Sequence, residues 1–293
     1  MKDNPGRKSR WSVVVIYAIA MAWVEAAVVY YLRTMVDRIE PHQANPLPII
    51  GGLGTAELVR EAATLVMLLA VGTLAGRNWR SRLAYAAIAF GFWDIFYYVF
   101  LKVMCGWPHS IFDWDVLFLL PLPWWGPVLA PVLISVLMIL WGTLVTSERG
   151  SNAARGEGIA WAISGLGMLL ALYVFMADTM SVAGQGAEVV RNVLPQTFNW
   201  AWLCVALSLM SAPVGLTVSR FLVQGRRRVT SLAVETGRAD YATARISALS
   251  IINPTREAAR ESEQYSNVAG YRNVDAPEAA TRRQGSITSA EPN

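Results

Sequence analysis

The chain has 293 residues, of which 54% are hydrophobic and only 16% are charged. Soluble globular proteins carry about 25% charged residues, and they cannot hide this much apolar surface in one core. Two cysteines are too few for a small secreted domain held together by disulfides. The composition therefore predicts a multi-pass helical membrane protein, but it does not point to a particular reaction.

The apolar residues gather in six runs, each long enough to cross a bilayer as a helix. About 20 residues at about 1.5 Å per residue span the roughly 30 Å of hydrocarbon. Backbone amides in lipid need partners within the protein, and the alternation typical of barrel strands is missing. We expect an all-α bundle of six transmembrane helices, at about 11–32, 57–76, 83–104, 127–146, 158–180 and 197–223.

The positive charges beside these runs predict the orientation, because Lys and Arg concentrate in cytoplasmic flanks. With the N-terminus inside, the inner flanks carry twelve such residues and the outer segments carry four. We therefore expect the chain in the cell membrane with both termini in the cytoplasm. The inner set is Lys2, Arg7, Lys8, Arg10, Arg77, Arg80, Arg82, Arg149, Arg155, Arg226, Arg227 and Arg228, and the outer set is Arg33, Arg38, Arg60 and Arg191.

A stretch rich in proline and tryptophan, residues 116–127, precedes the fourth run. Its three prolines cannot share one straight helix, because proline lacks the N–H donor and clashes with the preceding turn. Trp124 and Trp125 favour the headgroup region of a bilayer. We expect a short interfacial or re-entrant segment on the outer side, and kinks in the fourth and sixth spans at Pro131 and Pro213.

The sequence also divides into three parts by composition. Residues 1–10 form a basic N-terminus, residues 11–223 hold the transmembrane domain, and residues 224–293 are polar, with 10 Arg and 8 acidic residues. This last part shows little helical periodicity beyond one short stretch around 254–264. It is expected to be a mostly disordered cytoplasmic tail.

Ionisable residues inside the spans are the strongest functional signal in the sequence. Each costs about 2.5–3.5 kcal/mol near the centre of a helix on insertion scales, so they indicate a functional site. The alternative is that acid–base pairs such as Glu25 or Glu61 with Arg60 only lock helices together. Asp94 falls at the middle of the third span, and Glu25 and Glu61 lie somewhat further out in the first and second. The inner half of the spans is almost wholly apolar. This one-sided distribution predicts a polar funnel that opens to the extracytoplasmic side.

Helical spacing places these groups on shared faces. In the third span, Gly91, Asp94, Tyr98 and Lys102 follow one another at steps of three or four, and the small residue lets another helix approach closely. In the second span, the residues at 57, 60, 61 and 64 share one side, and Gly72 and Gly76 permit close packing. The candidate ligand-binding residues are Glu25, Arg60, Glu61, Asp94, Tyr98 and Lys102.

Metal and cofactor sites receive weaker support. The two histidines lie in outer loops, so a haem held by histidines from two helices is not expected, and we predict no cofactor. Cys105, His109, Asp113 and Asp115 could bind a divalent metal together with an acid of the second span, but no recognised ligand spacing supports this. A turn-forming loop is the preferred interpretation.

Three classes of function fit these observations. The first is a membrane protein whose outer pocket binds or transports a small polar ligand, an ion or a proton. The second is a membrane enzyme that uses a pair of carboxylates, with or without a metal. The third is a non-catalytic subunit whose buried charges pair with protein partners in the membrane or through the tail. Besides the lipid bilayer, we expect a small ligand rather than nucleic acid, and we favour the first class.

Overall fold

The computed structural model describes residues 5–43, 53–147 and 157–223, together with several single residues between 238 and 247. Residues 1–223 form one compact unit, and residues 224–293 form a second. The described residues of the second unit, which lie between Arg238 and Ser247, are helical. The predicted disordered tail, with its short helix around 254–264, therefore falls largely outside the described residues.

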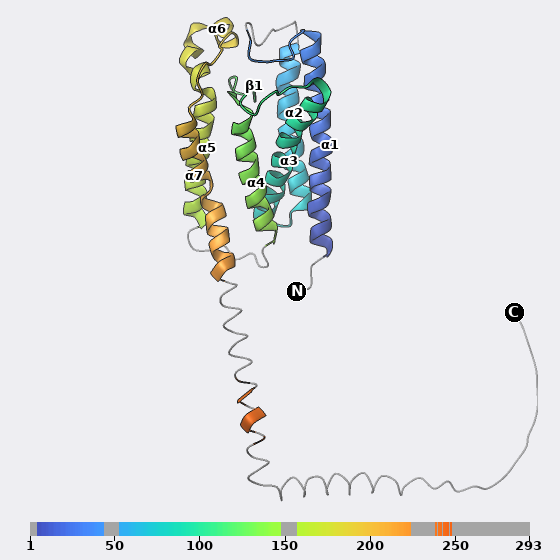
Figure 1. Ribbon diagram of the computed structural model, residues 1–293, viewed down its shortest axis with the longest axis vertical. Helices are drawn as coiled ribbons and strands as arrows, with labels where there is room; N and C mark the ends of the chain where they lie inside the picture. Colours follow the sequence, from blue (N-terminus) through green and yellow to red (C-terminus); the bar gives the residue numbers. More distant parts are fainter. Residues whose placement is uncertain are drawn as a thin grey trace, which may run out of the picture. The chain divides into compact units, whose positions relative to one another are not determined.

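Helices make up nearly all of the first unit (Figure 1). They are α1 (Pro5–Met35), α2 (Leu53–Ala75), α3 (Trp79–Cys105), α4 (Leu129–Ser147), α5 (Glu157–Val182), the 3-10 helix η1 (Ala183–Gln185), α6 (Ala187–Arg191) and α7 (Trp200–Met210). A further helix, Ala212–Val223, follows α7. Two short strands, β1 (Trp114–Val116) and β2 (Trp125–Pro127), lie between α3 and α4.

Five helices are long and apolar enough to cross a membrane, and they carry the first five predicted spans. In place of the sixth span there are two helices, α7 and Ala212–Val223, with a bend of 40° between them. The bend lies just before Pro213, whose missing N–H interrupts helical hydrogen bonding, as expected. Pro131 does not kink its helix, because it lies in the first turn of α4, where amide groups have no partner within the helix. The described residues therefore contain five candidate spans, or six if the bent pair counts as one.

Helix α3 packs against α1, α2 and α4. Small residues bring these helices close together. A Cβ atom on Gly91 would lie 2.7 Å from the carbonyl oxygen of Ser135 in α4, and one on Gly72 of α2 would lie 2.6 Å from the Cβ of Ala86. The expected close helix packing at both glycines is thus confirmed.

Helices α5 and α7 form a pair that contacts the other helices mainly through α4 and β2. Figure 1 shows this pair beside α4, with the N-terminus of α1 and the end of the last helix at the same end of the bundle. At that end, Glu157 of α5 pairs with Arg80 Nε of α3 at 3.1 Å and with Arg220 Nη2 of the last helix at 3.4 Å. One carboxylate therefore connects three helices there.

At the opposite end of the bundle, the proline-rich segment folds as a β-hairpin (Figure 1). Strands β1 and β2 pair antiparallel, with Asp115 opposite Gly126. The described residues are mostly helical, as the sequence predicts, and the hairpin is a small β element that it did not predict. Trp125 is only 1% exposed and Trp124 stacks on Phe175 of α5, so both tryptophans pack within the protein. Gly126 permits this packing, since a Cβ there would lie 2.8 Å from the Phe175 ring.

The packing of α3 on α4 predicts opposite effects for two glycine substitutions. Gly142→Ala is expected to lower the free energy of unfolding by about 1–3 kcal/mol, because the new Cβ would lie 2.5 Å from the Ala84 carbonyl oxygen. Gly165 of α5 has open space around it, so Gly165→Ala is the matched control and is expected to preserve or raise stability. Unfolding in detergent, followed by circular dichroism, compares the variants. Equal effects would contradict this packing.

Candidate functional site

A pocket of about 890 Å³ lies in the half of the bundle that carries the hairpin. Its volume falls within the range of about 300–1,000 Å³ that is typical of small-molecule sites. The walls come from α1, α2, α3, the hairpin loop, α4, α5, η1 and α6. Five of the six candidate residues line it, namely Glu25, Arg60, Glu61, Asp94 and Tyr98.

Lys102, the sixth candidate, is not among the residues that line the pocket. Its side chain is exposed near the end of α3, and its Nζ donates a hydrogen bond to the carbonyl oxygen of Gly106 at 2.8 Å. A lysine in the last turn of a helix commonly binds the unpaired carbonyl groups there. Lys102 therefore caps α3 in this structure.

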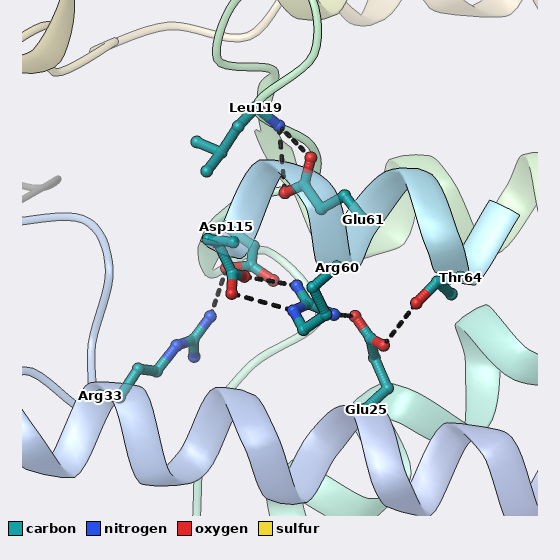
Figure 2. Close-up of polar contacts among 8 residues, drawn as sticks. Glu25, Arg33, Arg60, Glu61, Thr64, Asp115 and Leu119 are labelled. Atoms are coloured by element: carbon teal, nitrogen blue, oxygen red, sulfur yellow. Dashed lines mark hydrogen bonds and ion pairs between the residues drawn. The ribbon is translucent and has the colours of Figure 1, made fainter. Parts of the chain in front are cut away.

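Arg60 of α2 is held by carboxylates from two helices (Figure 2). Its Nε donates to Oε2 of Glu57 at 2.9 Å, a second guanidinium nitrogen also binds Glu57, and Nη1 binds Glu25 of α1. Glu25 accepts a further hydrogen bond from Thr64 Oγ1 at 3.2 Å. Such charge-assisted, bidentate hydrogen bonds of arginine are strong and fix the orientation of the guanidinium group. This cluster connects α1 to α2 beside the pocket.

A second ion pair, between Arg33 of α1 and Asp115 of β1, was not predicted from the sequence. Arg33 Nη2 lies 2.7 Å from Asp115 Oδ1, and the two side chains are 12% and 1% exposed (Figure 2). The guanidinium also lies 4.3 Å from the centre of the Trp107 ring. Burial raises the pKa of Asp115 above its ordinary value, and the positive charge of Arg33 opposes this shift. The pair fixes the hairpin to α1 at the edge of the pocket.

Glu61 lies on the same side of α2 as Arg60, but its partner is the hairpin loop. Its carboxylate accepts the backbone N–H of Leu119, at 2.9 Å to one oxygen and 3.2 Å to the other (Figure 2). Within the described ranges Glu61 forms no ion pair. Glu61 therefore positions the loop over the pocket, and the charge of the neighbouring Arg60 acts on it without forming an ion pair.

Asp94 lies on the face of α3 that meets α4. It is 7% exposed, and Oδ2 accepts a hydrogen bond from Ser135 Oγ at 2.8 Å. Its other oxygen has no hydrogen bond to any residue that the structure describes. Because a carboxylate accepts up to about four hydrogen bonds, Asp94 retains most of its capacity for a bound group.

The candidate metal ligands near the hairpin serve other roles. Asp113 accepts the backbone N–H groups of His109 and Ser110 at 2.7 and 3.2 Å, which stabilises a turn. The His109 ring lies 3.2 Å from Glu40, and Asp115 is bound by Arg33. In the part of the chain that the structure describes, no three His, Cys, Asp or Glu residues are grouped to hold a metal. Both cysteines are free thiols.

Comparisons of the chain with models of protein families, with curated proteins and with solved structures find no match. The chemistry of the pocket follows from its own residues. Arg33 and Arg60 are bound by carboxylates, whereas Glu61 and Asp94 form no ion pair with any residue that the structure describes. Carboxyl groups in this situation accept hydrogen bonds from a ligand, bind a cation or exchange a proton.

The cluster around Arg60 predicts a large loss of stability when its charge is removed. Arg60→Gln is expected to cost about 2–3 kcal/mol, less than the roughly 3–5 of a fully buried pair because its side chain is 22% exposed. The matched control is Arg191→Gln, whose exposed pair with Glu188 is worth about 0–1 kcal/mol.

Unfolding of the purified variants in detergent measures both effects. The double variant Glu25→Gln/Arg60→Gln is expected to recover part of the loss, because it leaves fewer unpaired buried charges. If Arg60→Gln costs no more than Arg191→Gln, the cluster does not hold α1 and α2 together.

Proposed function

We propose that this integral membrane protein binds a small ligand, ion or proton in a pocket that opens to the extracytoplasmic side. The observation that supports this function is the gathering of Glu25, Arg60, Glu61, Asp94 and Tyr98 around one pocket of about 890 Å³. These residues come from three different helices. Of the carboxylates, Glu61 and Asp94 are the proposed ligand contacts, since Glu25 neutralises Arg60.

The proposed orientation of the protein in the membrane is inferred from the distribution of Lys and Arg residues. Both ends of the helical unit, the start of α1 and the end at Val223, lie opposite the hairpin and the pocket (Figure 1). The excess of Lys and Arg beside those ends favours the cytoplasm. The pocket then faces outward, and both termini lie on the cytoplasmic side of the cell membrane.

The apolar inner half of the spans favours binding over passage of a solute through the protein. Conduction requires polar groups or water along the whole path, and the deepest ionisable residue of the pocket is Asp94. A membrane enzyme is the second candidate. Glu61 and Asp94 favour it, because two carboxyl groups that form no ion pair with the described residues and line one pocket are suited to acid–base catalysis.

Thiol labelling from outside the cell tests the proposed pocket. In a chain whose two native cysteines are serines, Thr64→Cys is expected to react with a small, charged, membrane-impermeant methanethiosulfonate. Thr64 is only 2% exposed but lines the pocket. Thr179→Cys is the matched control, because Thr179 is equally buried in α5 but does not line the pocket, and it is expected to stay unlabelled.

In the same assay, Gly158→Cys reports whether the reagent reaches the cytoplasmic side of the membrane. Gly158 is exposed at the start of α5, at the end opposite the pocket, so its cysteine should react only after the cells are permeabilised. Labelling of Thr64→Cys only after permeabilisation would reverse the orientation. Absence of labelling under both conditions would overturn a solvent-accessible pocket.

A further inference from the structure

The lining of the pocket is divided by chemistry. Its charged and hydroxyl side chains come mainly from α1, α2 and α3, including Glu25, Arg60 and Tyr98. The hairpin loop, α4 and α5 contribute mostly apolar side chains. These are Leu117, Phe118, Leu122, Trp124, Ile134 and Phe175. A ligand that fills the pocket therefore meets polar groups on one side and hydrocarbon on the other.

The apolar wall is a continuous set of packed rings. The centres of the Phe118 and Trp124 rings are 5.1 Å apart, and Trp124 stacks on Phe175 at 6.5 Å with nearly parallel planes. Phe118 also stacks on Phe90 of α3 at 6.4 Å. Since the rings already support one another, an apolar group can bind against them without reordering the wall.

The polar wall discriminates between head groups by charge. Four arginines line the pocket. Arg33, Arg60 and Arg191 are bound by carboxylates, and Arg38 also has an interaction partner. An anionic head group would have to displace those partners and would also face Glu61 and Asp94. A cationic group that donates hydrogen bonds would instead use the unfilled acceptor capacity of both carboxyl groups.

The pocket also lies between two groups of helices. On one side α2 packs on α1 and α3, and on the other α5 packs on α7 and β2. Both α2 and α5 line the pocket, yet they belong to different packing groups. A ligand with a hydrocarbon portion would suit a site bordered by helices that face the bilayer.

We propose that the ligand is an amphiphilic amine, an inference that rests on the proposed function. Its protonated nitrogen binds between Glu61 and Asp94, and its apolar part lies against Phe118, Trp124 and Phe175. The same chemistry is found in a water-soluble alkylamine and in a long-chain amine dissolved in the bilayer. The experiment below separates these two sources.

The test uses the full chain in phosphatidylcholine nanodiscs and four soluble probes. Hexylamine combines both proposed features, ethylamine lacks the apolar part, hexanol lacks the charge and hexanoate reverses it. Calorimetric titration, corrected for empty nanodiscs, is expected to give hexylamine a Kd at least about tenfold lower than that of any other probe. Octadecylamine added to the bilayer should compete with hexylamine if the natural source is the membrane, and should fail to compete if the source is water.

Variants connect this binding to the proposed residues. Asp94→Asn is expected to raise the Kd of hexylamine at least about tenfold while leaving that of hexanol unchanged. Asp178→Asn is the matched control, because Asp178 is exposed on α5 and does not line the pocket. If Asp94→Asn fails to accumulate, Glu61→Gln provides the same test, since glutamine still accepts the Leu119 N–H.

Each other outcome overturns a defined part of the proposal. Equal affinities for ethylamine and hexylamine would indicate a simple cation site, and tighter binding of hexanoate would indicate an anion site. If none of the probes binds although Thr64→Cys is labelled from outside, the proposal of an amphiphilic amine as the ligand is wrong, whereas the proposal of an outward-facing pocket is supported. If Thr64→Cys is not labelled at all, the pocket itself fails.

Discussion

A guanidinium placed among apolar helices costs several kcal/mol unless carboxylates surround it. Arg60 meets this requirement with Glu57 on its own helix and Glu25 on α1. The ion pairs therefore determine how α1 and α2 face each other in the half of the bundle that holds the pocket. The pair of Arg33 and Asp115 does the same for the hairpin, which forms part of the pocket wall.

Helix α3 links this electrostatic arrangement to packing. Because Gly91 has no Cβ, α4 packs very close to α3: a Cβ at this position would lie 2.7 Å from the carbonyl oxygen of Ser135. One helical turn further along, Asp94 accepts the hydroxyl of the same serine. A close helix contact and an oriented carboxyl group are therefore two results of one interface. The remaining acceptor atom of Asp94 is left for the pocket, because the contact with α4 uses only one side of the carboxyl group.

The sequence predicted the parts of this structure that depend on local pattern. Apolar runs predicted the helices, and glycine spacing predicted the contacts at Gly72 and Gly91. The depth of ionisable residues within the spans, together with helical spacing, identified five residues that line one pocket. The hairpin was missed because strands of three residues carry too little alternation to be detected. The Arg33–Asp115 pair was missed because 82 residues separate its members, and their proximity depends on how the hairpin folds against α1.

Lys102 illustrates the limit of placing residues by helical face alone. It follows Tyr98 by one turn, but the helix ends three residues later, and its long side chain turns to the carbonyl group of Gly106. The sequence gives the angle of a side chain around a helix axis. It does not show whether the end of that side chain caps the helix, contacts a neighbouring residue or points into a cavity.

The carboxylate of Glu157 has a mechanical consequence for the two groups of helices. It ties α3, α5 and the last helix together at the end away from the pocket. Elsewhere α5 packs on α7, and near the pocket it also contacts the hairpin, η1 and α6. The two ion pairs of Glu157 therefore restrict movement between α3, α5 and the last helix at the end away from the pocket.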